Sequence, residues 1–494
     1  MDSLIRIHEM DNVAVATGAI PAGTRLNVGD GDVTAREEIP AGHKIALRTI
    51  KEGENVIKYG FPIGHAKRDI GAGEWVHTHN TASNLSGLKE YTYQPVHCHE
   101  GQEEAASFMG YVRGDGSVGV RNEVWIVPTV GCVNGIAEAI EDLARAEMPQ
   151  GVERVCAYTH PYGCSQLGGD HEMTQKALCG LIRHPNAAGV LVLGLGCENN
   201  QIDSLKEVLG PYDPKRVRFL VCQQVEDEIQ EGLAIVRELM KDAAEYKREK
   251  VPASKLIIGL KCGGSDGFSG ITANPLLGSL VEKLTAQGGS AMLTEVPEMF
   301  GAETILMNRC RDEETFDKTV KLINDFKEYF MRYGEKINEN PSPGNKKGGI
   351  TTLEEKSLGC VQKGGRAPVE DVLEYGEPIR EKGLSLLQAP GNDLVASTAL
   401  AISGAQMVLF TTGRGTPFGC PVPTAKIATQ QDIATRKSGW IDFSAGPLLE
   451  GKSMKEETEK LFEYVLKVAS GEEKPKSEKL SKRNLAIFKD GVTL

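Results

Sequence analysis

The 494-residue sequence has few aromatic residues, no long apolar run and no excess of basic residues. Phe, Trp and Tyr make up 6% of the chain. No run of apolar residues approaches the roughly 20 that cross a bilayer, and the first twelve residues lack the apolar core of a signal peptide. Lys and Arg number 56 against 68 Asp and Glu, a net charge of −12, whereas binding to phosphate backbones needs a basic surface. We therefore expect a cytoplasmic protein with neither a membrane nor a nucleic-acid partner.

The cysteine and glycine patterns exclude several common sites. None of the eleven cysteines is separated from another by only two residues, which excludes zinc-ribbon and thioredoxin motifs. An odd number of cysteines in a large chain without a leader also argues against a disulfide framework. The chain contains no GxxxxGK[ST] motif, which excludes a P-loop. Gly194–Asn199 follows a predicted strand but lacks the third glycine of a dinucleotide fingerprint, and no acidic residue ends the next strand. A nicotinamide or flavin site is therefore disfavoured.

The first ninety residues contain a recurring phrase of Ile, two spacers and Gly. It occurs at 20–23, 39–42, 50–53 and 70–73. Glycine allows the positive φ of a tight turn, and short β-rich runs separate the phrases. The region is too short for helical crossovers. We predict a small all-β module over residues 1–90, followed by a linker over 91–109.

The rest of the chain alternates strands, polar loops and helices. This order predicts two α/β domains with mainly parallel sheets, over residues 110–246 and 256–494, joined by a charged linker at 247–255. The basic stretch 472–483 is predicted to be mobile. The whole is a multidomain α/β protein with a small all-β domain at its N-terminus.

Gly189–Asn200 is the most informative strand end. A continuous apolar run is followed by Gly194-Leu-Gly196 and then by Cys197 and Glu198. Ligands of open α/β sheets bind at the carboxyl ends of the strands. Cys132 and Cys164 follow two other predicted strands beside glycines, so we expect all three cysteines at one edge of a sheet. The alternative is that each is an ordinary buried thiol.

Histidines form two further candidate sites. His77 and His79 alternate along a predicted strand, so both imidazoles would face the same side and could chelate one divalent metal. The alternative is two surface histidines on an edge strand. His97-Cys98-His99 has ligand-type residues too, but it lies in the linker, which would not hold ligands rigidly.

The polar loops suit a small, hydrophilic, anionic ligand. Arg121 and Arg414 lie in glycine-bounded or polar contexts, and Arg clamps a carboxylate through two hydrogen bonds. Asn, Asp, Ser and Thr side chains can form hydrogen bonds with hydroxyl groups of a ligand. A sugar acid has both features. For Arg414, the alternative role is a structural anchor of its loop.

Long motifs along nearly the whole chain identify it as a member of the altronate/galactarate dehydratase family by resemblance. They are NVIKYGFPIG (55–64), VHTHN (76–80), GVRNEVWIVPTVGCVNGIA (119–137), YGCSQLG (162–168), RHPNAAGVLVLGLGCENNQ (183–201), CGGSDGFSGITANP (262–275), LTEVPEMFGAE (293–303), NPSPGNKKGGITTLEEKSLGC (340–360), TTGRGTPFG (411–419) and AIFKDGVTL (486–494).

The resemblance implies a hydro-lyase that converts D-altronate to 2-dehydro-3-deoxy-D-gluconate in hexuronate (galacturonate) catabolism. It also implies Fe2+, or Mn2+, as cofactor and a SAF-type β-clip fold for the N-terminal module. Galactarate dehydratase and sulfolactate sulfo-lyase activities are alternatives within the family. A non-catalytic sugar-acid-binding protein is an alternative outside it. The sequence leaves the oligomeric state open, a homodimer included.

The reaction assigns roles to the candidate residues. Removing the proton next to a carboxylate creates an enediolate, which needs a metal or cationic clamp, and a base must take the proton. We expect His77 and His79 to bind the metal, and Arg414, Asn274 and Arg121 to bind substrate. The candidates for acid–base catalysis are His160, Glu198 and Asp266. Alternatively, Cys132, Cys164 and Cys197 hold an iron–sulfur cluster or line the site. Because Mn2+ would not replace a cluster, we favour mononuclear iron.

Overall fold

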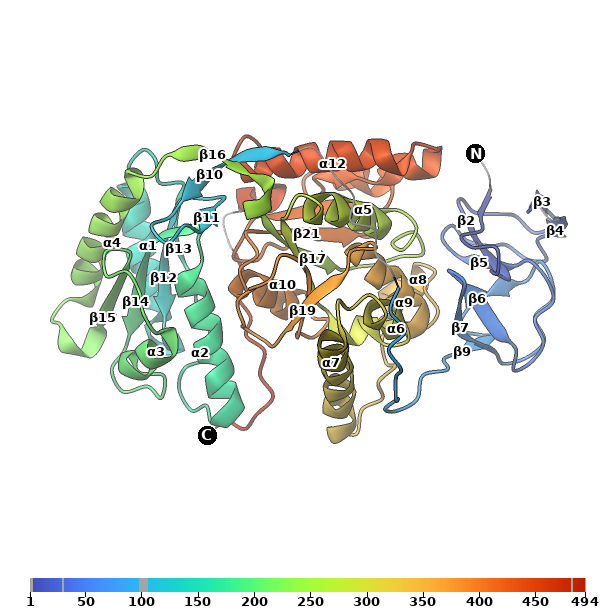
Figure 1. Ribbon diagram of the computed structural model, residues 1–494, viewed down its shortest axis with the longest axis horizontal. Coiled ribbons are helices and arrows are strands. Elements are labelled where there is room, and N and C mark those ends of the chain that lie inside the picture. The colour runs from blue at the N-terminus through green and yellow to red at the C-terminus, as the bar shows by residue number, and fades with distance from the viewer. Residues whose placement is uncertain (1–2, 29–30, 97–104, 481–482, 494) are drawn as a thin grey trace.

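The computed structural model describes residues 3–28, 31–96, 105–480 and 483–493. Three domains lie in a row (Figure 1). The N-terminal β domain is at one end, the second domain is at the other, and the C-terminal domain lies between them. His97, Cys98 and His99 fall outside the described residues. No described helix has both the length and the apolar character needed to cross a membrane.

The N-terminal domain is built from short strands joined by tight turns. They are β1 (Leu4–Ile5), β2 (Val13–Ala16), β3 (Arg25–Asn27), β4 (Asp32–Thr34), β5 (Lys44–Ala46), β6 (Asn55–Lys58), β7 (Phe61–Ala66), β8 (Trp75–Val76) and β9 (Thr81–Ala82). They form sheets with the orders β1-β2-β5-β8, β3-β4 and β6-β7-β9.

The recurring Ile-x-x-Gly phrases organise this domain. Ile20 pairs with Ile39 and Ile50 pairs with Ile70 through isolated antiparallel bridges, and all four isoleucines are buried. The glycine of each phrase has a φ between 78° and 84°, a backbone conformation that residues other than glycine rarely adopt. The repeat therefore places an apolar side chain in the core and turns the chain directly after it.

The second domain is a parallel sheet with helices on both faces. Its strands are β12 (Glu123–Pro128), β13 (Arg154–Ala157), β14 (Ala187–Gly194) and β15 (Val217–Val221), in the order β13-β12-β14-β15. Its helices are α1 (Asn134–Ala146), α2 (Gly168–Arg183), α3 (Ile202–Leu209) and α4 (Glu228–Ala244). Strands β12 and β14 are buried along their whole length because α1 and α4 cover one face and α2 the other.

The charged segment predicted as a linker contains a strand of a small antiparallel sheet. Strand β16 (Arg248–Pro252) pairs with β10 (Ser107–Val112), which also pairs with β11 (Val118–Gly119). Val251 is buried, while Glu249 and Lys250 are exposed. The charged residues therefore face solvent from a strand, which their composition alone did not indicate.

The C-terminal domain contains a larger, wholly parallel sheet. Its strands are β17 (Ile257–Cys262), β18 (Ser290–Leu293), β19 (Val369–Leu373), β20 (Gly383–Leu387), β21 (Met407–Thr412), β22 (Thr424–Ala428) and β23 (Phe443–Ser444). Its helices are α5 (Ala273–Thr285), α6 (Glu303–Met307), α7 (Glu313–Arg332), α8 (Pro343–Lys347), α9 (Leu353–Cys360), α10 (Asp393–Ile402), α11 (Gln431–Arg436) and α12 (Met454–Ala469). Helices α5 and α12 contribute to one core cluster, and α10 packs with α2 of the second domain in another.

The strand order identifies where this sheet can bind a ligand. It runs β19-β20-β18-β17-β21-β22-β23, so the chain leaves β17 in one direction and returns to β21 on the other side. A crevice forms at the carboxyl ends of the strands at such a reversal. The multidomain α/β fold predicted from the sequence is confirmed.

Candidate active site

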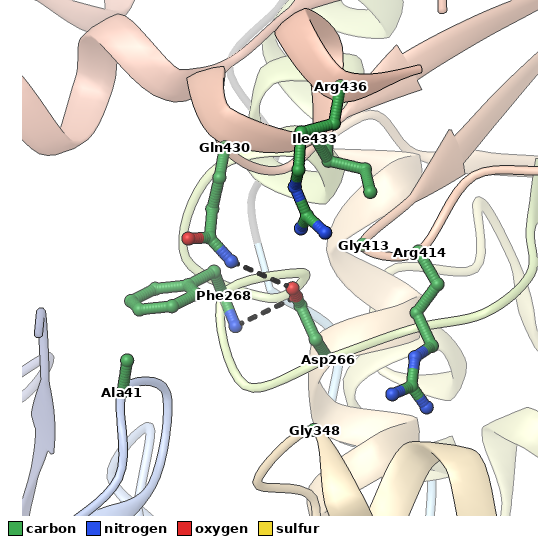
Figure 2. Close-up of a pocket in the computed structure, with 9 residues that line it drawn as sticks. All are labelled: Ala41, Asp266, Phe268, Gly348, Gly413, Arg414, Gln430, Ile433 and Arg436. Carbon is green, nitrogen blue, oxygen red and sulfur yellow. Dashed lines mark hydrogen bonds between the residues drawn. The ribbon is translucent and has the colours of Figure 1, made fainter. Parts of the chain in front are cut away.

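A cavity of about 260 Å³ lies at the carboxyl ends of β17, β21 and β22 (Figure 2). It is lined by the loops that follow these strands, by α11, by the end of α8 and by one residue of the N-terminal domain. The lining residues are Ala41, Asp266, Phe268, Gly348, Gly413, Arg414, Gln430, Ile433 and Arg436. Because the cavity lies where the strand order reverses, we take it as the candidate active site.

Two arginines make the cavity suitable for an anion. Arg414 follows β21, and its Nη1 donates to the carbonyl oxygen of Gly344, 2.9 Å away. Arg436 ends α11 and pairs with Asp432 at 2.7 Å. Guanidinium groups bind carboxylates through parallel hydrogen bonds. Arg414 therefore lines the cavity, and substrate binding by its side chain stays a prediction. Arg436 was missed because an arginine near a helix end has an ordinary surface pattern.

Asp266 lies on the wall of this cavity, where four hydrogen bonds hold its carboxylate. Its Oδ1 accepts from the backbone N–H of Phe268 and the hydroxyl of Ser269, at 3.1 and 3.2 Å. Its Oδ2 accepts from Thr429 and Gln430, at 3.0 and 3.1 Å. Despite these bonds, burial raises the pKa of Asp266 above its ordinary value, which suits a proton acceptor.

Gly413 makes room for that carboxylate. The loops after β17 and β21 are tied by the N–H of Gly413, which donates to the carbonyl oxygen of Gly264. A Cβ at position 413 would lie 2.3 Å from the carboxyl carbon of Asp266. Only glycine therefore allows the loop carrying Arg414 to pass this close to Asp266.

Asn274 lies beside the cavity and ties three elements together. Its Oδ1 accepts from the hydroxyl of Thr411 at 2.6 Å, and its Nδ2 donates to the carbonyl oxygen of Gly359 at 2.9 Å. It also lines a narrow cavity together with Asp266 and Cys360. In this structure Asn274 positions α5 and α9 against β21, and substrate binding by its side chain remains a prediction.

His77 and His79 do not alternate along a strand. Strand β8 ends at Val76, and the side-chain oxygen of Asn80 accepts from the N–H of His77 at 2.9 Å. The N–H groups of Asn80 and Thr81 donate back to the carbonyl oxygen of His77, so the chain turns here. Both imidazoles pack near Trp75, with ring centroids 5.5 and 5.2 Å away.

The two histidines alone do not make up a complete set of metal ligands. Burial lowers the pKa of His77 to about 3, so its ring is neutral, as a ligand must be. Its Nδ1 lies 3.0 Å from the hydroxyl of Thr351, in the loop between α8 and α9. Within the described residues, no third potential ligand joins His77 and His79 at metal-binding distance.

The three cysteines of the second domain lie on loops that are bonded to one another. Cys132, Cys164 and Cys197 follow β12, β13 and β14, and all three are exposed. The N–H of Gly131 donates to the carbonyl oxygen of Tyr162, and that of Asn200 to the carbonyl oxygen of Gly163. The expected gathering of these loops at one sheet edge is therefore present in the structure.

His160 and Glu198 lie at this same edge, in the domain farthest from the N-terminal β domain (Figure 1). Nε2 of His160 lies 2.8 Å from the carbonyl oxygen of Pro128, and burial lowers the pKa of His160. Glu198 accepts hydrogen bonds from Thr129, Leu195 and Gly196. These two candidates for acid–base catalysis are therefore not in the cavity that contains Asp266 and Arg414.

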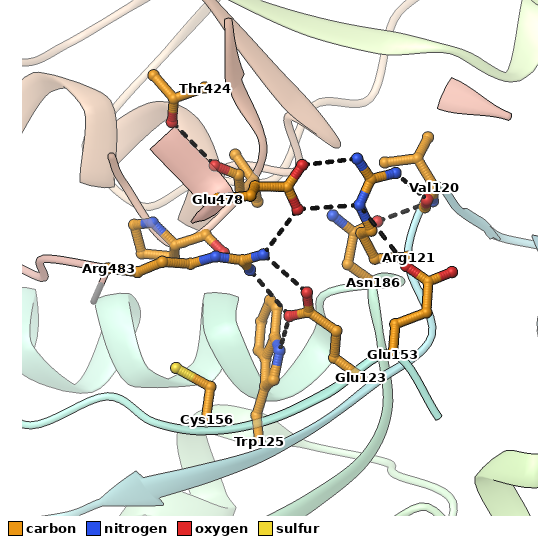
Figure 3. A network of polar contacts seen from close by, with 12 residues as sticks. Val120, Arg121, Glu123, Trp125, Glu153, Cys156, Asn186, Thr424, Glu478 and Arg483 are labelled. Carbon is orange, nitrogen blue, oxygen red and sulfur yellow. Dashed lines mark hydrogen bonds and ion pairs between the residues drawn. The ribbon is translucent and has the colours of Figure 1, made fainter. Parts of the chain in front are cut away.

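Arg121 lies in a third place, buried between the second and C-terminal domains (Figure 3). Its Nε and Nη2 donate to the two carboxylate oxygens of Glu478, at 3.0 and 2.7 Å. Its Nη1 donates to the carbonyl oxygens of Val120 and Val468. Because it is 1% exposed and already holds a carboxylate in both arms, Arg121 joins two domains rather than facing the cavity.

The sequence interpretation missed a cluster of Cys262, Glu298 and Cys360. Their potential ligand atoms all lie within 4.8 Å of one another, and all three residues are buried. Cys262 ends β17 before two glycines, which is the signal that singled out the other cysteines. Glu298 and Cys360 carry no such cue, because one follows β18 at a distance and the other ends a helix.

Family models match all three domains of the chain. The altronate/galactarate dehydratase SAF domain matches residues 2–84. The second domain of D-galactarate dehydratase/altronate hydrolase matches residues 110–244. The C-terminal domain of D-galactarate/altronate dehydratase matches residues 253–493. The N-terminal β domain is thus a SAF domain, as the resemblance implied.

Curated relatives match over the full length. The chain is 55% identical to altronate dehydratase of Bacillus subtilis (strain 168) over 100% of both chains. It is 53% identical to altronate dehydratase of Escherichia coli (strain K12) over 99% of both. It is 33% identical to galactarate dehydratase (L-threo-forming) of Escherichia coli (strain K12), over 98% of this chain and 96% of the relative. The chain therefore belongs to the altronate/galactarate dehydratase family.

Proposed function

We propose that this chain is an altronate dehydratase, a hydro-lyase that converts D-altronate to 2-dehydro-3-deoxy-D-gluconate in hexuronate breakdown. The observation that carries the proposal is full-length identity of 55% and 53% to two altronate dehydratases. The relative named galactarate dehydratase is 33% identical, which makes D-galactarate the second candidate substrate.

The cavity can accommodate the chemistry of such a substrate. D-altronate carries one carboxylate, which Arg414 and Arg436 can bind, and hydroxyl groups that the amide of Gln430 can contact. Asp266 is the candidate base for the proton on C2, since its burial favours the protonated form that it would reach. Loss of the hydroxyl from C3 then gives an enol, which becomes the 2-keto acid.

The family resemblance implies Fe2+, or Mn2+, as cofactor. When bound near the substrate carboxylate, such an ion stabilises the negative charge that builds up as the C2 proton leaves. His77 and His79 stay a prediction for its ligands. An iron–sulfur cluster on Cys132, Cys164 and Cys197 stays the alternative, at an edge of the molecule separate from the cavity with Arg414.

A substrate comparison tests the proposal. Purified protein is supplied with Fe2+ under anaerobic conditions and given D-altronate, D-galactarate or sulfolactate in parallel, and the 2-keto-3-deoxy product is identified by mass spectrometry. We expect the largest kcat/KM with D-altronate. Turnover of another acid without turnover of altronate would contradict the proposed substrate. Binding of altronate without turnover, and without any effect of a chelator, would favour a sugar-acid-binding protein instead.

A further inference from the structure

Cys262, Glu298 and Cys360 come from three separate segments and bring their side chains to one buried point. The two sulfur atoms lie 3.4 Å apart. The Sγ of Cys262 lies 3.5 Å from Oε2 of Glu298, and that of Cys360 lies 3.1 Å from the same oxygen. The three residues are at most 4% exposed. Two sulfurs and one carboxylate oxygen therefore surround a single small volume.

Neighbouring groups fix the orientation of the three potential ligands. The Nζ of Lys356 lies 2.8 Å from Oε1 of Glu298, which leaves Oε2 directed at the sulfurs. The Nζ of Lys363 donates to the Sγ of Cys262 at 3.0 Å. At metal sites, hydrogen bonds of this kind from neighbouring residues hold the metal-binding side chains in place.

Glu295 adds a strained backbone to this surrounding shell. Its φ is 68°, a left-handed conformation that is unusual for a residue other than glycine and that concentrates at functional sites. Its carboxylate, 0% exposed, accepts from both Lys261 and Lys363 and from the N–H of Cys262. The loop after β18 is thus held in a costly conformation next to the two thiols.

The charges of the cluster would balance when it binds a divalent cation. Lys261, Lys356 and Lys363 provide three positive charges, and Glu295, Glu298 and Asp393 provide three negative ones. One divalent ion that displaces one proton from each thiol adds two positive and two negative charges. The net charge of the buried group is then unchanged, so binding does not create an uncompensated buried charge.

We propose that Cys262, Cys360 and Glu298 bind one thiophilic divalent transition-metal ion. Two thiolates at about 2.3 Å from a tetrahedral ion lie about 3.8 Å apart, so the observed sulfur separation of 3.4 Å needs only a small side-chain rotation. The two thiol hydrogens are released as protons, and no oxidant or reductant takes part. Three protein ligands leave a fourth position open, as in catalytic metal sites.

The site borders the candidate active site. Cys360 lines the narrow cavity that Asp266 and Asn274 also line, and Asp266 lines the larger cavity with Arg414. A catalytic role for this ion rests on the function proposed above, whereas metal binding itself does not. The experiment below therefore measures binding without turnover.

Cobalt titration of the reduced, metal-free protein tests the proposal. We expect one equivalent of Co2+ per chain to produce thiolate-to-cobalt charge-transfer absorption in the near ultraviolet. Cys262→Ser and Cys360→Ser should each weaken that binding by more than about tenfold, since even outer contacts cost 10- to 100-fold. Glu298→Gln should weaken it while retaining absorption. Circular dichroism confirms that each variant is folded.

Other cysteines supply the controls. Cys310→Ser and Cys420→Ser remove single buried thiols and should leave the absorption unchanged, as should joint replacement of Cys132, Cys164 and Cys197 by Ser. Absorption that survives in Cys262→Ser and Cys360→Ser, or that disappears with the three exposed cysteines, would overturn the proposal. So would a wild-type protein without the absorption.

X-ray absorption spectroscopy provides a measurement that does not depend on variants. In wild-type protein loaded with one equivalent of Zn2+, we expect two sulfur ligands at about 2.3 Å together with lighter atoms. A set of nitrogen and oxygen ligands without sulfur would contradict the proposal and would favour binding by histidine side chains. Product formation from altronate is measured separately, so failure of the proposed function and failure of this metal site give different results.

Discussion

The Nζ of Lys44 in the SAF domain lies 2.8 Å from Oε2 of Glu355 in the C-terminal domain, and both side chains are almost completely buried. Lys58 of the SAF domain lies 2.8 Å from the other carboxylate oxygen. Burial alone would raise the pKa of Glu355, but the two ammonium groups hold it at about 2. One carboxylate thus joins the SAF domain to the start of α9.

Glu355→Gln is expected to destabilise this junction strongly. The substitution leaves two buried ammonium groups without a counter-charge, and breaking a buried pair from one side costs about 3–5 kcal/mol. Denaturant unfolding measures the loss. The matched control is Asp69→Asn, which breaks the exposed ion pair between Lys51 and Asp69 at the same 2.8 Å and should leave the midpoint unchanged. Equal effects of the two substitutions would contradict the prediction.

Glu478→Gln tests whether Arg121 is structural. Glu478 accepts from Arg121 and also from Arg483 at 3.1 Å. Its loss leaves Arg121 with only Glu153, 3.7 Å away, as a counter-charge, whereas Arg483 keeps its pair with Glu123. We expect unfolding to become easier by about 3–5 kcal/mol, with KM for the substrate unchanged in the folded protein. Glu472→Gln, in the same segment but exposed, is the control. A raised KM without loss of stability would return Arg121 to the substrate site.

The sequence predicted those parts of the site that depend on local pattern. Asp266 and Arg414 follow predicted strands within glycine-rich loops, and parallel strands bring such loops to one edge. Long-range partners could not be predicted in this way. Arg121 resembles a substrate clamp until its partner, Glu478, is found 357 residues away.

The local sequence pattern gave a wrong prediction where a side chain forms hydrogen bonds with the backbone of a predicted strand. The alternation of His77 and His79 predicts a strand, yet Asn80 bonds to the backbone of His77 and of Trp75 and turns the chain. Asn side chains often stabilise turns in this way. Likewise, the basic composition of residues 472–483 predicts a mobile segment, whereas the side chains of Glu478 and Arg483 are buried and pair with Arg121 and Glu123 of the second domain.

His184 makes the junction of the second and C-terminal domains sensitive to acid. Its Nε2 lies 3.1 Å from the carbonyl oxygen of Ala405, and its Nδ1 accepts from the N–H of Asn186. Burial, with a smaller contribution from the positive charges of Arg216, Arg483 and Arg113, lowers the pKa of His184 to about 3 from 6.5. The unfolded chain therefore binds a proton between pH 6.5 and 3 that the folded chain does not.

Stability should accordingly fall as the pH drops below 6.5, by up to about 1.4 kcal/mol per pH unit from this group. His184→Gln keeps a donor for Ala405 but does not titrate, so its unfolding midpoint should depend less on pH in this window than that of the wild type. His8→Gln, at an exposed position, should keep the wild-type slope. Parallel slopes for wild type and His184→Gln would refute the assignment.

His77→Ala and His79→Ala test the predicted metal pair. If both imidazoles bind the catalytic metal, each substitution should abolish turnover while leaving the fold intact, as judged by circular dichroism. His65→Ala, elsewhere in the SAF domain, is the control and should retain turnover. Turnover near the wild-type level in either His77→Ala or His79→Ala would remove the pair from the site and leave Cys262, Glu298 and Cys360 as the metal ligands to examine.

Arg414 should determine how strongly the substrate carboxylate is bound. Loss of hydrogen bonds to a charged group costs about 1.5–3 kcal/mol, so Arg414→Ala should lower kcat/KM for altronate by about 10- to 100-fold. Arg414→Lys keeps the charge but not the two-armed geometry and should recover part of the loss. Arg145→Ala, on the surface of α1, should have no effect. If Arg414→Ala lowered stability but left kcat/KM unchanged in the folded protein, the bond from Arg414 to Gly344 would be its whole role, and the residue would be an anchor of its loop.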